Sequence, residues 1–190
     1  MFNFNKTAKK ALDILASATG LRLVPDPLLP PAGKDVCILD IQGYRQVESY
    51  TCGFVAGAMI LHTFHHGASL RRFFEQCSPD REMGLQQNRL VRSLRANGIG
   101  VGLRHDLDFE NIAATLEQGY PIITLTKTER SDVIHWVVIY GYGRRPNRVF
   151  IAGEGLPLIN NLTGHKEIPW PRFSRSKWAN RGFGLVCWGK

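Results

Sequence analysis

The hydrophobic residues of this chain change their spacing near residue 120, which limits the folds open to it. Before that point, apolar residues recur at helical spacing in four segments, at 52–65, 70–74, 85–97 and 109–119. After it, runs rich in β-branched and aromatic residues indicate strands at 121–126, 135–140, 149–152 and 184–188. Gly98 and Gly119 stand where the last two helical segments should end. Helices followed by hairpin-connected strands predict an α+β fold.

The chain has 190 residues, enough for one full-sized domain with its own core. Residues 4–18 have helical spacing, and a proline-rich stretch at 25–31 follows them. We therefore interpret 1–34 as an N-terminal arm and 35–190 as the domain; the arm either packs on the core or serves a protein partner, as a propeptide or a docking element. No apolar run approaches the ~20 residues needed to cross a bilayer, and the N-terminus does not read as a signal peptide. We expect a cytoplasmic protein.

The net charge is +8, but the arginines are spread along the chain without forming a basic run. Charge alone is a weak indicator of nucleic-acid binding, so nucleic acid is not the expected partner. The four cysteines are Cys37, Cys52, Cys77 and Cys187, with no CxxC pair among them. This pattern predicts free thiols rather than a disulfide framework, which leaves Cys52 available for chemistry.

Gln46 stands six positions before Cys52, and Gly53 follows the cysteine where the first helical segment begins. A helix N-terminus and a nearby imidazolium both lower the pKa of a thiol. His135, which opens a predicted strand, supplies that imidazole if the two halves of the fold bring it to the thiol. The side-chain amide of Gln46 and the backbone N–H of Cys52 can hold an oxyanion. Together these residues predict acyl-transfer chemistry with a thiol nucleophile and a histidine base.

This constellation resembles the papain-like cysteine peptidases, whose chain order is glutamine, cysteine, histidine, then asparagine or aspartate. Within that superfamily the chain is most similar to the bacteriocin-processing (double-glycine leader) peptidases and their stand-alone relatives. The matching stretches lie at 46–53, 90–99, 116–123, 135–142 and 173–178. The resemblance covers residues 40–188 and implies a papain-like fold, in which a helix carrying Cys52 packs against an antiparallel sheet carrying His135. It also implies a peptide or protein substrate, cleaved after small residues such as Gly-Gly.

The chain departs from this family at the third catalytic position. The family usually places an aspartate and a proline after the strand that follows the histidine, whereas this chain reads Gly153-Glu154-Gly155. Glu154 is our candidate for orienting the imidazole, since Asn147 comes early in the sequence and Asn160 and Asn161 come late. A dyad without a third member would still be competent, because that residue mainly fixes the tautomer and orientation of the histidine.

A metal site is not expected, although His62 and His66 would share a helix face near His65 and Cys77. No HExxH motif accompanies them, and the glycines at 141–143 and 153–155 lack the strand–loop–helix context of a phosphate loop. We expect no metal and no cofactor. Three functions remain open at this point: a thiol peptidase, an acyltransferase or glutamine deamidase using the same site, and an inactive peptide-binding module.

Overall fold

The computed structural model of the protein describes residues 33–44, 46, 48–127, 133–153 and 166–189. Its centre is a seven-stranded antiparallel sheet in the order β2-β7-β3-β4-β5-β6, with β1 also paired to β4. The strands are β1 (Val36–Ile38), β2 (Ile99–Arg104), β3 (Ile122–Lys127), β4 (Ile134–Arg144), β5 (Asn147–Ala152), β6 (Lys166–Pro169) and β7 (Gly184–Gly189). The helices are η1 (Ser49–Thr51), α2 (Cys52–Phe64), α3 (Leu70–Cys77), α4 (Gln87–Ala96), α5 (Phe109–Glu117), α6 (Trp170–Arg172) and the π-helical turn η2 (Phe173–Lys177).

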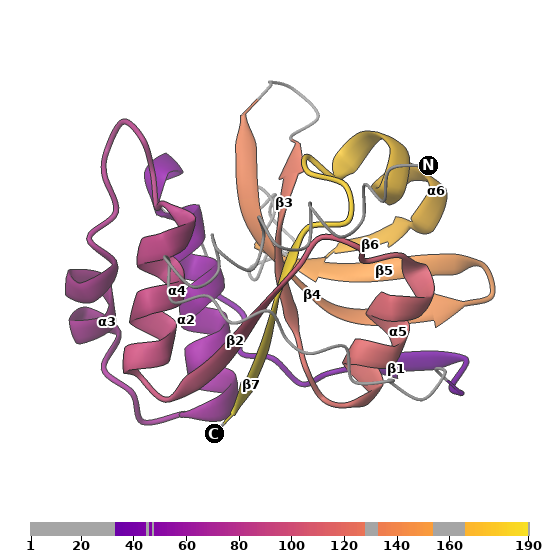
Figure 1. Ribbon diagram of the computed structural model, residues 1–190, viewed down its shortest axis with the longest axis horizontal. Coiled ribbons are helices and arrows are strands. Elements are labelled where there is room, and N and C mark those ends of the chain that lie inside the picture. Colours follow the sequence, from indigo (N-terminus) through magenta and orange to yellow (C-terminus); the bar gives the residue numbers. More distant parts are fainter. Residues whose placement is uncertain (1–32, 45, 47, 128–132, 154–165, 190) are drawn as a thin grey trace, which may run out of the picture.

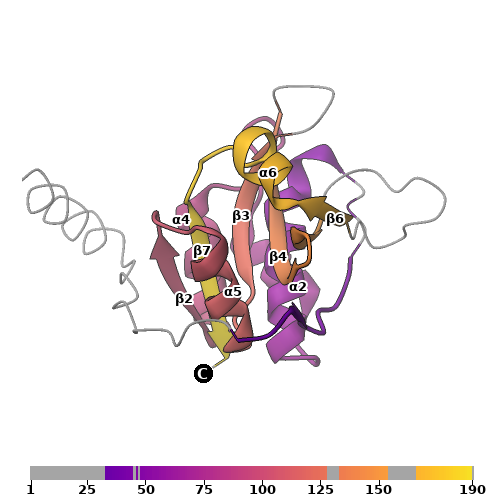
Figure 2. The same cartoon turned by 90° about the vertical axis from the view of Figure 1, so that its right-hand side faces the viewer.

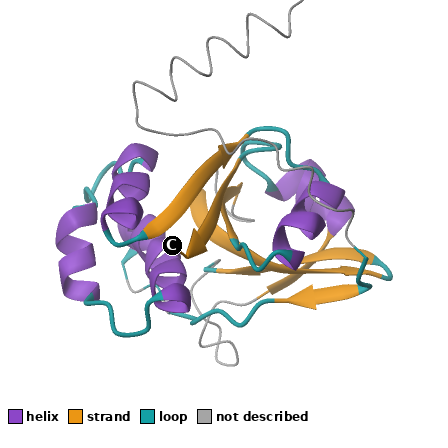
Figure 3. Ribbon diagram, turned by 60° about the horizontal axis from the view of Figure 1, so that its bottom comes forward, coloured by secondary structure: helices purple, strands orange, loops and turns teal. Residues whose placement is uncertain are grey.

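Helices cover both faces of this sheet and divide the core into two parts. Figure 1 shows α2, α3 and α4 grouped on one side of the strands, with α5 and α6 on the other. The same two groups of helices flank the strands in Figure 3. Side chains alternate between the faces of β4, so Trp136 and Val138 join the core beneath α2 while Val137 and Ile139 join the core beneath α5. The sheet therefore has no solvated face over most of β4.

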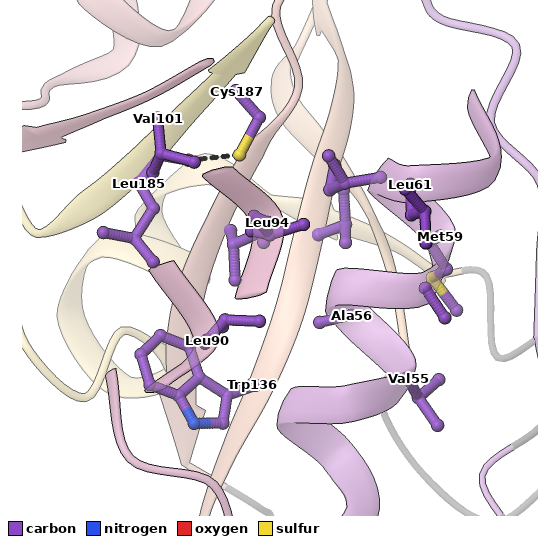
Figure 4. Packing of buried hydrophobic residues seen from close by; sticks show 14 of the residues in the cluster. Val55, Ala56, Met59, Leu61, Leu90, Leu94, Val101, Trp136, Leu185 and Cys187 are labelled. Carbon is purple, nitrogen blue, oxygen red and sulfur yellow. Dashed lines mark hydrogen bonds between the residues drawn. The ribbon is translucent and has the colours of Figure 1, made fainter. Parts of the chain in front are cut away.

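The helix that begins at Cys52 lies unusually close to its neighbours because its inner face carries small residues. Ala56 and Gly57 are buried between larger side chains of the first core, which Figure 4 shows packed between α2, α4 and the strands. A Cβ atom at Gly57 would come within 2.7 Å of Leu90 Cδ1 and 2.9 Å of Phe73 Cζ. Close packing of this kind fixes the position of α2, and therefore of its first residue, relative to the sheet.

The local signals at the helix ends agree with the structure. Asp108 caps α5 by accepting a hydrogen bond from the backbone N–H of Asn111 at 2.8 Å. Gly98 and Gly119 follow α4 and α5 with φ of 81° and 80°, a left-handed conformation that favours glycine. The expected C-terminal stops of both helices are thus confirmed.

The helical half of the chain also contains a strand that the sequence did not predict. A strand, β2, lies between α4 and α5 in the chain, and the last strand, β7, returns to the interior of the sheet between β2 and β3 (Figure 2). The segment 99–104 carries two glycines and no alternation, because all six of its residues are buried. Its periodicity therefore gave no strand signal.

The proposed N-terminal arm falls almost entirely outside the described residues. Its last two residues, Gly33 and Lys34, donate their backbone N–H groups to the carboxylate of Glu117 at 3.0 and 2.7 Å. The hydroxyl of Tyr142 donates to the same carboxylate. The start of the domain is thereby fixed to α5 and β4. Among the described helices, none is both long and apolar enough to cross a membrane.

Candidate active site

The loop before α2 is held in place by hydrogen bonds that converge on one carbonyl group. Gln46 is buried, and its Nε2 donates to Glu48 O at 2.8 Å. The hydroxyl and backbone N–H of Thr51 donate to the same oxygen at 2.7 and 3.1 Å. Three donors on one carbonyl fix the side-chain amide of Gln46 just ahead of the first turn of α2. Gln46, which the sequence predicts to hold an oxyanion, is thus hydrogen-bonded to the loop that leads into Cys52.

Cys52 is the first residue of α2, as the sequence predicted, and only 8% of its surface is exposed. Burial raises the pKa of its thiol, while hydrogen bonds from the backbone of Trp136, Gly53 and Cys52 itself oppose that rise. A thiol of raised pKa is largely protonated at neutral pH, so this cysteine needs a base before it can attack a carbonyl carbon. The bond from Trp136 shows that the start of α2 lies against β4, the strand that also carries His135.

The contact between α2 and β4 forms because Gly53 leaves room for two side chains. A Cβ atom at Gly53 would come within 2.8 Å of Leu85 Cβ and 2.9 Å of Trp136 Cδ1. The indole Nε1 of Trp136 in turn donates to Leu85 O at 3.1 Å, which fixes the ring between helix and loop. The first turn of α2 therefore rests on the start of β4, and Cys52 lies beside the strand that carries His135.

His135 lies near the beginning of β4, directly opposite Thr126 on β3. Its Nδ1 atom is shielded from solvent, although the residue as a whole is partly exposed. A partly exposed histidine at the end of a strand can exchange protons with a substrate and yet be oriented by the protein. The sequence paired Cys52 with His135 by chain order. In the structure, Cys52 begins the helix that packs against β4, and His135 lies near the beginning of that strand.

The third catalytic residue expected from sequence, Glu154, lies outside the described residues, as do Asn160 and Asn161. Gly153 is the last described residue before this gap, and it lies against the backbone of Trp136 and Val137 with φ of 95°. Asn147 is paired with Arg144 at the opposite end of β4, so it cannot reach His135. The described part of β5 thus supplies neither a carboxylate nor a carboxamide at this end of the sheet.

His62, one of the histidines considered as a metal ligand, makes two hydrogen bonds within the fold. Tyr44 and His62 share a hydrogen bond through the phenol and Nδ1, and His62 Nε2 donates to Ala68 O at 2.8 Å. The ring therefore connects the loops at either end of α2 to the helix. Among the described residues, no group of three or more histidine, cysteine or acidic side chains is arranged to hold a metal ion.

The remaining thiols are poorer candidates for a nucleophile. All four cysteines are free, as predicted. Burial raises the pKa of Cys77 to about 11 and that of Cys187 further still, and both side chains are fully buried. Burial also raises the pKa of Cys37, which approaches Leu116 O on the far side of β4. Only Cys52 combines a helix N-terminus with the start of β4.

Sequence reasoning missed the residues that bring helix and strand together. Leu85, Trp136 and Thr126 were given no role at the site. A single sequence offers little signal for them, because an apolar side chain beside a catalytic residue looks like any other core residue. Gly53 was noted only as the glycine that follows the cysteine, and the structure shows that it makes room for Leu85 and Trp136.

Comparison with known proteins identifies the family and the fold of this chain. The family model described as "Peptidase_C39 like family" matches residues 38–183. No curated protein matches the chain. A double glycine motif protease from an AMS/PCAT transporter, solved with its leader peptide, is 18% identical, with a TM-score of 0.58 over 84% of this chain and 98% of its own.

Two further solved structures share the fold. The peptidase domain of Streptococcus ComA is 16% identical, with a TM-score of 0.58 over 78% of this chain and 98% of its own. A putative C39-like peptidase from Bacillus anthracis is 14% identical, with a TM-score of 0.59 over 83% and 99%. The expected α+β, papain-like fold and the resemblance to this peptidase family are therefore confirmed.

Proposed function

The chain belongs to the Peptidase_C39-like family and is a cysteine peptidase, and from this premise we propose that Cys52, His135 and Gln46 form its catalytic site. The observation that carries the proposal is the hydrogen bond from the backbone of Trp136 to the Cys52 sulfur. This bond joins the start of α2 to β4, the strand that also carries His135, which supports His135 as the base for this thiol. The side-chain amide of Gln46 donates to Glu48 O in the loop that leads into this helix, which supports its role as a fixed donor.

In the proposed reaction His135 takes the proton of Cys52, and the thiolate attacks the carbonyl carbon of the scissile peptide bond. The backbone N–H of Cys52 and the amide of Gln46 stabilise the resulting oxyanion, each donating a hydrogen bond. The imidazolium then gives its proton to the departing amine, and a thioester remains on Cys52. His135 next activates a water molecule, which releases the acid and restores the thiol. Glu154 remains our candidate for orienting His135, on sequence grounds.

We further propose that the enzyme cleaves after small residues such as Gly-Gly. The support for this is the likeness in fold to a double glycine motif protease that was solved with its leader peptide. Leu85 and Trp136 pack closely against Gly53 and fix the first turn of α2, which carries the proposed nucleophile.

The test uses a synthetic peptide with a central Gly-Gly and matched peptides in which either glycine is replaced by valine. We expect the wild-type enzyme to cut the first after the second glycine and to leave the others intact, as read by product mass. The substrate proposal fails if the valine peptides are cut and the Gly-Gly peptide is not. Addition of a primary amine separates hydrolysis from acyl transfer, because transfer adds the mass of the amine to the product.

The site assignment is tested separately with iodoacetamide, followed by mass spectrometry of the Cys52 peptide. We expect Cys52 to react much faster than Cys37, Cys77 and Cys187, and to lose that advantage in His135→Ala. In Gln46→Ala, the alkylation rate should stay near that of wild type while kcat falls by about 10²–10³-fold, since an oxyanion donor acts only in the transition state. Equal labelling of all four thiols would contradict the assignment.

A further inference from the structure

Thr126 is the cross-strand neighbour of His135. The register of the antiparallel ladder between β3 and β4 pairs Thr126 with His135 and Thr124 with Val137. Directly opposed side chains project from the same face of a sheet, with Cβ atoms about 4.5–5.5 Å apart. Figure 1 shows these ends of β3 and β4 side by side. The hydroxyl of Thr126 is thus within one side-chain rotation of the imidazole.

The burial of this hydroxyl is unusual. Thr126 is fully buried, and among the described residues its Oγ1 has no hydrogen-bond partner. Thr124, two positions earlier on the same face, is just as buried, but its Oγ1 donates to Phe183 O at 2.7 Å and accepts from Trp178 Nε1 at 2.8 Å. A buried hydroxyl without a partner destabilises the fold and calls for an explanation. Thr124 shows that the same face of β3 can satisfy such a group.

The surroundings of His135 give this hydroxyl a role. Gly153, at the end of the described part of β5, carries no side chain that could orient the ring. Thr126 flanks the histidine from the other neighbouring strand. Among the described residues, the titratable groups near this end of the sheet include the thiol of Cys52 on α2, the side chain of Lys127 on β3 and the ammonium of Lys177 on η2, which donates to Lys127 O at 3.4 Å.

We infer that Thr126 is a positioning residue for His135, whose hydroxyl accepts an N–H hydrogen bond from the imidazolium after it has taken the proton of Cys52. This inference rests on the proposed role of His135 as the base. The bond forms by rotation of the ring or of the hydroxyl, and no covalent change occurs at Thr126. By stabilising the charged ring, the contact favours the thiolate–imidazolium pair over the neutral thiol and imidazole.

The test measures the rate of Cys52 alkylation by iodoacetamide as a function of pH in the full chain. Thr126→Val removes the hydroxyl and keeps the shape of the side chain. We expect the pH midpoint of alkylation to rise by about 0.5–1 unit, which lowers the rate at neutral pH by roughly three- to tenfold. Thr126→Ser should restore the wild-type midpoint, because serine retains the hydroxyl. Thr126→Ala repeats the measurement if valine alters the fold.

Thr124→Val is the matched control, since it removes a buried hydroxyl whose hydrogen bonds are made elsewhere. It should lower Tm without moving the midpoint, whereas Thr126→Val should move the midpoint without lowering Tm. The inference is overturned if Thr126→Val alkylates with the wild-type midpoint, or if serine shifts it as far as valine does. His135→Ala distinguishes failure of this inference from failure of the proposed catalytic site. A wild-type midpoint in that variant refutes the role of His135 as the base, independently of the result for Thr126.

Discussion

Substituting Gly53 by alanine probes the contact that joins the nucleophile's helix to the histidine's strand. The added Cβ would come within 2.8 Å of Leu85 Cβ and 2.9 Å of Trp136 Cδ1. Both distances fall short of ordinary van der Waals contact by about 0.5–0.6 Å. Neither neighbour can give way by rotating a flexible end, because Leu85 Cβ is next to the backbone and the Trp136 ring is fixed by its bond to Leu85 O. The helix or the strand must therefore move.

The expected consequences are a loss of stability and a loss of reactivity at Cys52. Overpacking a core costs about 1–3 kcal/mol, and the better helix propensity of alanine returns at most about 1 kcal/mol of this. A shift of half an ångström between Trp136 and Cys52 disturbs the hydrogen bond on the sulfur. Since misplacement by about 1 Å can cost ~10²-fold in rate, we expect roughly a tenfold slower alkylation of Cys52. Urea unfolding and iodoacetamide labelling measure the two effects.

Gly57→Ala is the control, because it overpacks the same helix one turn further from the thiol. Its Cβ would meet Leu90 Cδ1 at 2.7 Å and Phe73 Cζ at 2.9 Å, both far ends of side chains. We expect a comparable or smaller loss of stability with an unchanged alkylation rate in the folded protein. Wild-type stability and wild-type reactivity in Gly53→Ala would refute the reasoning, since the contact between α2 and β4 would then not position the thiol.

Two further substitutions test the framework around the site. Trp178→Phe removes the indole N–H that Thr124 Oγ1 and Phe183 O accept at 2.8 and 3.2 Å, and should lower the free energy of unfolding by about 1–3 kcal/mol in urea titrations. The side chain of Arg104 lowers the pKa of Asp106, so this carboxylate stabilises the fold above its unfolded pKa and loses that effect as pH falls through its folded value. Asp106→Asn should cost no more than about 1 kcal/mol at neutral pH, because the carboxylate is largely exposed, and this difference should vanish in acid; an unchanged difference at low pH would contradict the assignment.

Much of the architecture could be predicted because its signals are local. Periodicity of the apolar residues predicted the helix at Cys52–Phe64 and the strands at 122–127 and 134–144. Glycine predicted two helix ends, at Gly98 and Gly119, because it favours the backbone conformation needed there. The strand at 99–104 was not predicted, because it pairs with β7 at the other end of the chain. Gly100 lies so close to the Trp188 ring on β7 that a Cβ would sit 2.1 Å from it. A glycine is needed at position 100 because Trp188, near the other end of the chain, occupies the space of a side chain there.

The sequence by itself indicated the chemistry that we propose for this protein, through a glutamine six positions before a cysteine, a glycine behind it, and a histidine opening a strand. Residue type and spacing suffice for this, because nucleophile, base and oxyanion donor are properties of individual side chains. Only the tertiary structure decided what surrounds them. Strand register and close packing join residues that lie far apart in the chain. They bring the backbone of Trp136 to the thiol and Leu85 against Gly53, and they place Gly153 beside Trp136 and the buried hydroxyl of Thr126 opposite His135.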